Sequence, residues 1–456
     1  MNNLPISSEQ ACKGRYSFIS LGCPKNTVDS ERMLGLLQLD GYELVREPHN
    51  ADFVVVNTCG FIEEARTESY SAIDEMLELK TQGKLKGVIV SGCLAERQKD
   101  ELLLDRPGID ALVGVFGREE VTKVADRLMG KHEQRMVFRP APIRALPDLD
   151  RLRITPQHFA YLKISEGCDR LCTFCDIPRM RGKHASKPME SILEEAHQLA
   201  EDGVKELNIV AQDTTYYGID NYGEPRLAQL LQQLNTVDGL EWIRLLYFYP
   251  MHISDELIDV IRDSKRIIPY IDMPLQHIND DMLKRMARRV NKRQTIETIE
   301  RLRAGIPDLC LRTTMLTGFP GETDEHFEEL IEFVNETRFD RLGVFSYSFE
   351  EATPSANLTD HINDDVKEAR RDTLMLTQQK IMYERNEMMV NRKLPVIVDQ
   401  AVPQQDNAWI GRTQADAPDI DSLVFLTGND TQLLPGQIVE AEIVTVKNYD
   451  LIGVVS

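Results

Sequence analysis

Long apolar runs are missing from this 456-residue sequence. No segment approaches the ~20 consecutive apolar residues that span a bilayer, and no charged-then-apolar leader stands at the start. These absences argue against a membrane protein and against secretion, so we expect a cytoplasmic protein. Low-complexity segments are also missing, and the length predicts two or three globular domains.

A surplus of positive charge is missing as well. The sequence holds 53 basic and 74 acidic residues, which gives a formal net charge of −21. General binding to nucleic acid requires excess Lys and Arg to neutralise phosphates, so contact with nucleic acid is not favoured, although a local basic face stays open. An acidic protein favours a basic macromolecular partner or a small substrate.

The strand and helix patterns divide the sequence into three parts. Residues 14–130 alternate short apolar runs with amphipathic stretches, which predicts a parallel sheet covered by helices. After a predicted linker at 131–153, residues 154–391 hold a longer β/α series that predicts a barrel or partial barrel. Residues 392–456 hold Val- and Ile-rich runs typical of a small all-β barrel. The expected strands are 16–21, 53–56 and 88–90, then 159–165, 206–211, 243–248, 268–272, 310–316 and 342–347, and the expected N-terminal helices are 28–39, 61–79 and 95–104.

Three of the eight cysteines lie in one loop directly after an expected strand. Cys168, Cys172 and Cys175 have C-x3-C-x2-C spacing. Three thiolates leave one iron of a 4Fe–4S cluster open, and that iron can chelate S-adenosylmethionine (SAM) for one-electron cleavage. Zinc is the alternative, but a closed zinc site would need a fourth nearby Cys or His, and His184 lies beyond the compact loop.

Three earlier cysteines, Cys23, Cys59 and Cys93, each follow an expected strand. The carboxyl ends of parallel strands share one edge of a sheet, so we expect these thiols to meet there. Nearby helix N-termini would favour the thiolate form and the negative charge of a cluster. Any one of them alone would be a core residue or a bystander more often than a ligand, but the shared placement predicts a second metal site.

Together the two cysteine sets resemble the radical SAM methylthiotransferase family, in which a cysteine-bearing N-terminal domain precedes a radical SAM core and a TRAM-type β-barrel. The central spacing, with an aromatic residue before the last cysteine, is the hallmark of the radical SAM superfamily. The sequence is similar to the ribosomal-protein branch of the family rather than to its tRNA branch, in which Gln-Met tends to follow the first cysteine. The similarity to the ribosomal-protein branch is carried by residues 20–26, 29–31, 57–62, 270–277 and 316–323.

The resemblance implies an α/β multidomain fold with two 4Fe–4S clusters and SAM as cofactors, and with Cys168, Cys172 and Cys175 as the catalytic residues. It implies transfer of a methylthio group to the β-carbon of an aspartate in small-subunit ribosomal protein twelve. One SAM would methylate a sulfur species on the first cluster, and cleavage of another at the second cluster would give a 5′-deoxyadenosyl radical that removes a hydrogen. An electron donor and a sulfur source would be further partners.

Five residues are candidates for cofactor binding. Phe174 precedes the last loop cysteine, and Gln212 and Asp213 end an expected strand, where Asp is equally an ordinary helix cap. Gly318 and Gly321 lie in a turn that follows another expected strand. The backbone of this turn could approach SAM closely, because glycine has no side chain, and a tight βα turn is the alternative.

Other residues are less specific. His277 fits either a substrate contact or a hydrogen-bonded structural role, and Cys12 and Cys310 are expected to be non-ligands. Lys187 stands where the family segment has Arg, which weakens a bidentate role. The strongest basic cluster could hold a carboxylate or phosphate, although a solvated helix face is the more common explanation. This cluster consists of Lys284, Arg285, Arg288, Arg289, Lys292 and Arg293.

The expected C-terminal barrel is acidic, which bears on the substrate. An acidic surface binds phosphate poorly and favours a basic ribosomal protein. The alternatives are methylthiolation of a tRNA adenosine and, in a different class, a non-catalytic iron–sulfur sensor or ribosome-binding scaffold. The barrel has Arg412 and Lys447 against Asp399, Asp406, Asp416, Asp419, Asp421, Asp430, Glu440, Glu442 and Asp450.

Overall fold

The computed structural model describes residues 12–130, 135–428 and 432–455. Two compact units make up the chain. The first unit holds the chain up to Ile154 together with Glu166–Asp169 and Cys175–Lys187, and the second holds Thr155–Ser165, Arg170–Phe174 and the chain from Pro188 onward. The segment that carries the central cysteines therefore contributes residues to both units.

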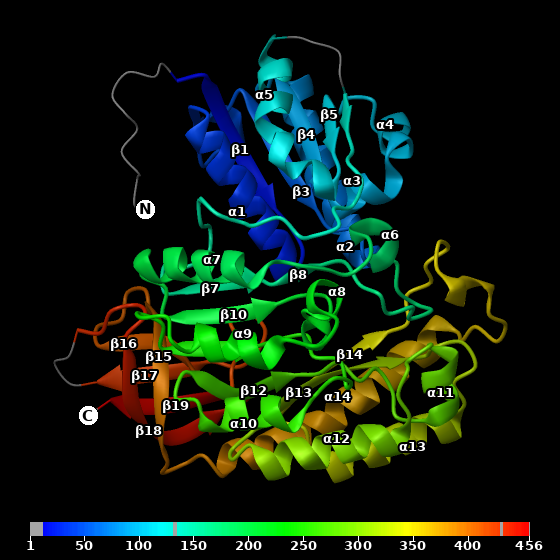
Figure 1. Cartoon of the computed structure of the whole chain (residues 1–456), viewed down its shortest axis with the longest axis vertical. Coiled ribbons are helices and arrows are strands. Elements are labelled where there is room, and N and C mark those ends of the chain that lie inside the picture. Colours follow the sequence, from blue (N-terminus) through cyan, green and yellow to red (C-terminus); the bar gives the residue numbers. More distant parts are fainter. Residues whose placement is uncertain (1–11, 131–134, 429–431, 456) are drawn as a thin grey trace. The chain divides into compact units, whose positions relative to one another are not determined.

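The first unit contains a six-stranded parallel sheet in the order β2-β1-β3-β4-β5-β6 (Figure 1). Strands β3 and β4 are buried along their whole length because helices cover both faces. Helices α1 and α5 pack on one face around Leu34 and Val124, and α2 to α4 pack on the other around Ile73 and Leu102. The strands are β1 Gly14–Ser20, β2 Tyr42–Leu44, β3 Phe53–Thr58, β4 Gly87–Gly92, β5 Ala111–Val113 and β6 Met136–Val137, and the helices are α1 Pro24–Leu39, α2 Glu63–Thr81, α3 Cys93–Gln98, α4 Asp100–Asp105, α5 Val121–Gly130 and α6 Ile177–Arg181.

This sheet confirms the predicted parallel α/β domain, with local differences. The helix expected at 95–104 is two helices, because Lys99 between them has a φ of 49°. No Gly or Pro marks this break in the sequence. Strands β2, β5 and β6 are too short for their periodicity to be read, and β6 lies within the predicted linker, of which residues 131–134 fall outside the described residues.

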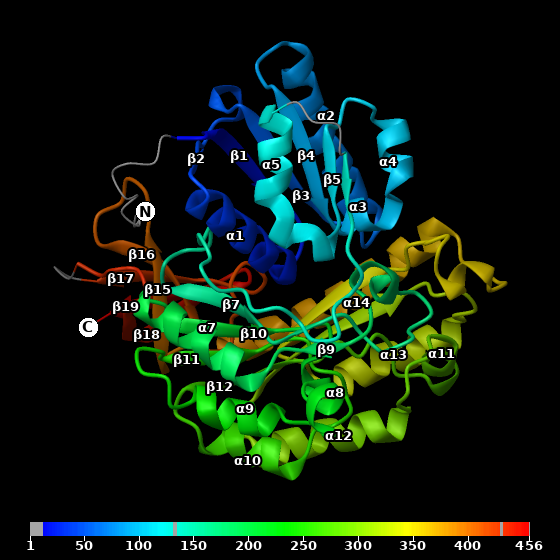
Figure 2. The same ribbon diagram turned by 45° about the horizontal axis from the view of Figure 1, so that its top comes forward.

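The second unit contains six parallel strands in the order β14-β13-β12-β11-β10-β7, which confirms the predicted partial barrel (Figures 1 and 2). Helices cover one face of this sheet, where residues such as Leu162, Leu207, Ile243 and Leu311 form the largest apolar core. The strands are β7 Phe159–Lys163, β10 Glu206–Val210, β11 Trp242–Leu245, β12 Ile267–Asp272, β13 Cys310–Thr317 and β14 Arg341–Ser346. Of two further short strands, β9 Ala185–Ser186 belongs to the first unit, and β8 Ser165–Glu166 has one residue in each unit. The helices are α7 Met189–Glu201, α8 Ile219–Tyr222, α9 Leu227–Leu234, α10 Asp255–Asp263, α11 Asp280–Arg285, α12 Lys292–Gly305, α13 Asp324–Thr337 and α14 Asp364–Glu387.

The C-terminal strands close into a five-stranded barrel in the order β15-β16-β17-β19-β18, as predicted. This barrel packs against the amino-terminal ends of the core strands. Glu206, the first residue of β10, pairs with Arg412 at 2.7 Å, and Arg341, the first residue of β14, pairs with Asp416. The strands are β15 Lys393–Ala401, β16 Ala408–Thr413, β17 Val424–Gly428, β18 Ile438–Lys447 and β19 Asp450–Val455.

These contacts change the charge argument for the barrel. Three of its acidic residues pair with arginines inside the second unit, so the negative charge that faces outward is smaller than the sequence count. The pairs are Asp399 with Arg412, Asp416 with Arg341 and Asp421 with Arg312. Asp430 lies outside the described residues. Across the parts of the chain that are described, no helix is long and apolar enough to cross a membrane.

Candidate functional site

The three earlier cysteines follow neighbouring strands whose ends are in register. Ser20 of β1 pairs with Asn57 of β3, and Asn57 pairs with Ser91 of β4. Cys23 follows β1 after Leu21 and Gly22 and precedes α1, Cys59 comes directly after β3, and Cys93 begins α3 directly after β4. The sheet therefore brings these cysteines to one edge, as the strand-end placement predicted.

Two glycines let the three cysteine loops pack closely. A Cβ on Gly22, which has a φ of 91°, would lie 2.9 Å from the Cβ of Cys59. A Cβ on Gly60 would lie 2.9 Å from the backbone of Leu94, the residue after Cys93. Since real Cβ contacts are longer than this, a side chain at either position would push the loops apart.

A buried arginine, Arg181, lies at the centre of this group. Its Nε donates to the Sγ of Cys93 at 3.3 Å, and its side chain is 1% exposed. Its other nitrogens donate to Glu166 at 2.8 Å, to Asp29 at 2.9 Å and to Asn26 at 3.3 Å. All these residues belong to the first unit. Arg181 thus places a fixed positive charge beside the sulfurs.

The thiols have different proton affinities. Burial opposes ionisation of Cys23, but the charges of Lys25 and Arg181 and the amides at the start of α1 outweigh it and lower the pKa of this thiol. Burial and the neighbouring Cys23 raise the pKa of Cys59. Burial raises the pKa of Cys93 to about 12, although Arg181 opposes the shift. Metal binding would deprotonate all three.

The donor set has the chemistry that an iron–sulfur cluster requires. Cys23, Cys59 and Cys93 are free cysteines, and 4Fe–4S clusters are held by cysteine thiolates. The nearby cation and helix N-termini suit the negative charge of such a cluster.

The central cysteine loop begins at a glycine whose surroundings leave no room for a side chain. Gly167 has a φ of 70°, and a Cβ there would lie 2.1 Å from the carbonyl oxygen of Lys183. The amide of Cys168 donates to the carbonyl of Gly182 at 3.1 Å. Within the first unit, the start of the loop is therefore fixed to the segment that carries Arg181.

In the second unit, the middle of the loop is fixed to the turn that follows α11. Thr173 donates through its amide to the carbonyl of Met286 at 3.1 Å and through its hydroxyl to that of Arg285 at 2.9 Å. Cys172 is buried, and its Sγ accepts from the Nη1 of Arg288 at 3.4 Å. A cation therefore accompanies this cysteine as Arg181 accompanies Cys93.

The five candidate cofactor residues have protein contacts of their own. Phe174 packs in an apolar cluster and meets Phe319 edge-on at 6.4 Å between ring centroids. Gly318 and Gly321 have φ of 73° and 82°, and Cβ atoms there would meet Lys367 and Arg285, so the tight-turn explanation accounts for both. Their contact with SAM stays a prediction.

Asp213 acts as a helix cap, the alternative that the sequence left open. It accepts from the amide of Tyr216 at 3.2 Å, while its other oxygen accepts from Arg170 at 2.8 Å. The Arg170 guanidinium lies against the rings of Tyr216 and Tyr249. Gln212 lies half-buried beyond β10. A direct role for Gln212 and Asp213 at SAM stays a prediction.

The less specific candidates have structural roles. Lys187 is fully buried and pairs with Asp148 at 2.6 Å. The Nδ1 of buried His277 accepts from the amide of Asn279 at 3.0 Å. Cys310 is buried in β13, and Cys12 is exposed.

Two arginines that donate to cysteine sulfurs were not among the predicted site residues: Arg181 and Arg288. Arg181 lies close to the central motif in sequence, which is the available signal, whereas the sequence of the basic cluster that holds Arg288 favours a solvated helix face. Arg288 is separated from Cys172 by 116 residues and Arg181 from Cys93 by 88, so sequence spacing could not pair them.

Comparison with known families finds three matches along the chain. The radical SAM superfamily matches residues 162–334, and the TRAM domain matches residues 390–455. Residues 15–114 match a family described as uncharacterized protein family UPF0004. The order of the matches agrees with the three predicted parts.

Several curated relatives are similar over nearly the whole chain. The ribosomal protein uS12 methylthiotransferase RimO of Lachnoclostridium phytofermentans is 49% identical, over 96% of this chain and 98% of its own length. That of Clostridioides difficile is 46% identical over 95% of this chain and 97% of its own length. Among solved structures, the radical SAM methyltransferase TsrM of Kitasatospora setae is similar with a TM-score of 0.56 at 13% identity, covering 75% of this chain and 76% of TsrM, which supports the fold alone.

Proposed function

Because this chain belongs to the family of ribosomal protein uS12 methylthiotransferases, we propose that it transfers a methylthio group to the β-carbon of an aspartate in uS12. Family membership confirms the resemblance read from the motifs and the predicted class of radical SAM methylthiotransferase. It also supports the predicted cofactors, 4Fe–4S clusters and SAM. The structural observation that carries the proposal is the meeting of three strand-end cysteines around one buried arginine.

The proposal assigns one cluster to each cysteine set. Cys23, Cys59 and Cys93 would hold the first, and Cys168, Cys172 and Cys175 would hold the second and leave one iron open for SAM. When bound, these groups supply the sulfur and the radical that removes hydrogen from an unactivated carbon. No acid–base side chain can perform that abstraction.

The residues of the chain would control the setting of this chemistry. Arg181 donates a hydrogen bond to Cys93 and Arg288 donates one to Cys172. Such donors orient the ligands and shift cluster potentials. The glycines of the cysteine loops hold the backbone where a side chain would block it.

The test is a reaction with two separate products. The reconstituted enzyme is incubated with dithionite, SAM and purified uS12, and the protein is analysed by mass spectrometry for an added methylthio group, while 5′-deoxyadenosine is measured by chromatography. We expect both products. Modification of tRNA without modification of uS12 would support the tRNA adenosine alternative and overturn the proposed substrate.

Two matched variants separate the cysteine sets. Cys172→Ala should abolish both products, because the radical is no longer formed. Cys93→Ala should still release 5′-deoxyadenosine but leave uS12 without the methylthio group. A wild-type enzyme that forms neither product would favour the non-catalytic sensor or scaffold.

The family membership extends the proposal to partners and location. The substrate would be met in the cytoplasm, and the reaction would need a reductant and a source of sulfur. The contacts of Asp399, Asp416 and Asp421 leave fewer barrel carboxylates for a basic substrate than the sequence count implied.

A further inference from the structure

A positively charged cleft of about 500 Å³ opens in the second unit beside the central cysteine loop. Leu171 of the loop forms one wall, and Lys284, Arg288 and Arg289 line the other. The one carboxylate at the cleft, that of Asp280, accepts from the amide of Lys292 at 2.6 Å. The cations that line this cleft outnumber its carboxylates, although the chain as a whole has a net charge of −21.

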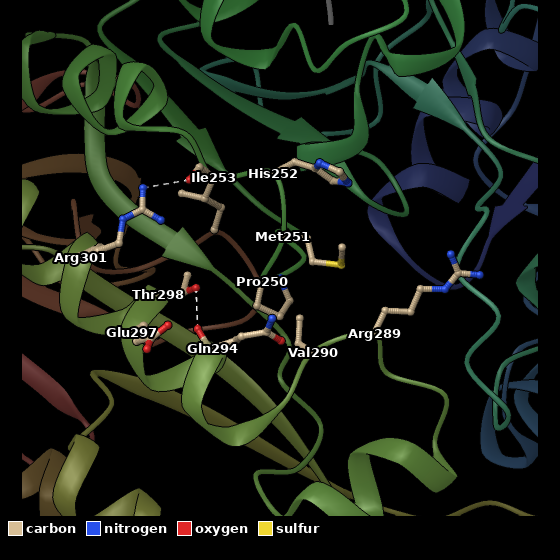
Figure 3. A pocket seen from close by; sticks show the side chains of 10 residues that line it. All are labelled: Pro250, Met251, His252, Ile253, Arg289, Val290, Gln294, Glu297, Thr298 and Arg301. Atoms are coloured by element: carbon tan, nitrogen blue, oxygen red, sulfur yellow. Dashed lines mark hydrogen bonds between the residues drawn. The ribbon is translucent and has the colours of Figure 1, made fainter.

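Two of these cations are available to a partner. Lys284 and Arg289 are exposed, and over residues 12–130, 135–428 and 432–455 neither side chain forms an ion pair or a hydrogen bond. Figure 3 shows the Arg289 side chain extending away from Glu297 and Arg301, which line an adjoining cavity of about 250 Å³. Arg293, another member of the basic cluster, differs from these two cations because it pairs with Glu297 at 3.6 Å.

The apolar wall of the cleft is equally exposed. Leu171 lies one residue before Cys172, and 62% of it is accessible to solvent. An exposed leucine beside unpaired cations combines an apolar contact with electrostatic guidance, which is the pattern of a protein docking surface.

The cleft is also connected to the cysteine. The Arg288 side chain lines the cleft, yet its Nη1 donates to the Sγ of Cys172 at 3.4 Å and its Nη2 donates to the carbonyl of Pro274 at 2.7 Å. Its guanidinium lies 4.2 Å from the ring centroid of Tyr249. A molecule seated in the cleft would therefore lie one side chain away from a proposed cluster ligand.

We propose that this cleft is the docking site of an acidic one-electron carrier protein. The inference rests on the proposed cluster at Cys168, Cys172 and Cys175, which must receive one electron for each SAM that is cleaved. The carrier, a reduced flavin or iron–sulfur protein, gives up one electron to that cluster and is itself oxidised by one electron, with no bond formed or broken. The proposed substrate is a basic protein, which the same cations would repel.

The experiment measures reduction of the cluster, not turnover. Holoenzyme is mixed in a stopped-flow spectrometer with photoreduced, acidic flavodoxin as the probe, and the rate is followed by absorbance with an electron paramagnetic resonance endpoint. The variant is Lys284→Glu with Arg289→Glu. The control is Lys265→Glu with Lys380→Glu, which makes the same change of charge at exposed lysines outside the cleft.

We expect the cleft variant to react with flavodoxin at least about tenfold more slowly at low ionic strength, within the range of electrostatic steering. The control should match the wild type, whose rate should fall steeply with added salt while that of the cleft variant changes little. Dithionite, which is too small to need the cleft, should reduce all three proteins alike.

Two results would overturn the proposal. The first is equal flavodoxin rates in the cleft variant and the wild type, and weakened binding of uS12 or RNA by that variant would then assign the cleft to the substrate. The second is an equal slowing with flavodoxin and with dithionite, because the cations would then act on the cluster itself and not on docking. If dithionite gave no reduced-cluster signal in the wild type, the cluster assignment itself would fail, and this is seen before flavodoxin is added.

Discussion

Replacing Arg181 should affect both the stability of the first unit and the potential of the cluster that we propose at Cys23, Cys59 and Cys93. Arg181 is 1% exposed and its guanidinium pairs with Asp29 and Glu166. Removing one partner from a buried ion pair costs roughly 3–5 kcal/mol because a charge is left uncompensated. Asp29 keeps its contact with Arg118, so Arg181→Gln should fall near the lower end of this range.

The shift in the midpoint potential of the cluster can be estimated separately from the loss of stability. The hydrogen bond from Arg181 to the Cys93 sulfur, at 3.3 Å, is charge-assisted, and such bonds are worth roughly 1.5–3 kcal/mol. Suppose that losing this hydrogen bond destabilised only the reduced cluster, by its full energy. The midpoint potential would then fall by ~60–130 mV, since a tenfold change in the equilibrium constant corresponds to 59 mV for one electron. The expected shift is negative and below this limit.

The assay is a redox titration followed by electron paramagnetic resonance, combined with urea unfolding of the apoprotein. Arg181→Lys keeps the positive charge but loses the planar guanidinium, which forms several hydrogen bonds at once. Its cluster potential should therefore lie between that of Arg181→Gln and that of the wild type. A destabilised Arg181→Gln protein whose cluster potential equals that of the wild type would refute the electrostatic role and leave Arg181 a purely structural residue.

Three further predictions concern stability and metal content. Gly318→Ala should lower the free energy of unfolding by about 2–5 kcal/mol, because an alanine there has left-handed strain and overlaps Lys367. Gly223→Ala should lower it by only about 1–2 kcal/mol, because Gly223 has a φ of 80° but no atom within 4 Å of an added Cβ. Equal drops in melting temperature would contradict this. Burial opposes ionisation of Glu206, but the charges of Arg412 and Arg244 outweigh it and lower the pKa of this carboxyl. The ionised carboxylate therefore stabilises the fold above pH ~4.3, and this stabilisation is lost as the pH falls through the pKa of the folded state. The difference in free energy of unfolding between the wild type and Glu206→Gln, measured with urea, should shrink in acid, and a constant difference would disprove this. Cys59→Ala should hold about four iron atoms per chain where the wild type holds about eight, and an unchanged iron assay would remove Cys59 from the ligands.

Sequence reasoning reached furthest where a pattern is local. The spacing of Cys168, Cys172 and Cys175 needs no tertiary information, because the whole motif lies in one loop. The meeting of Cys23, Cys59 and Cys93 followed from one rule of parallel sheets, and the register of β1, β3 and β4 agrees with it. Short strands such as β5 and the break at Lys99 left no periodic signal to read.

Charge counting was the weaker guide. A count of the acidic barrel residues treats all of them as facing solvent, whereas Asp416 pairs with Arg341 at the start of β14 and Asp421 pairs with Arg312 in β13. The sequence of the basic cluster near residue 288 favours a solvated helix face, but Lys284 and Arg289 border a cleft and Arg288 turns inward to Cys172. A count of charges cannot tell which of them neutralise one another.

The sequence by itself determined the order of the three parts, the two cysteine sets and the family, because covalent spacing and strand periodicity are short-range properties. Only the tertiary structure decided which charged groups accompany each cysteine. Arg181 reaches Cys93 across 88 residues and Arg288 reaches Cys172 across 116, and such contacts depend on how separate elements pack. The physical reason is that burial selects the partner of a charge, and burial exists only in the folded chain.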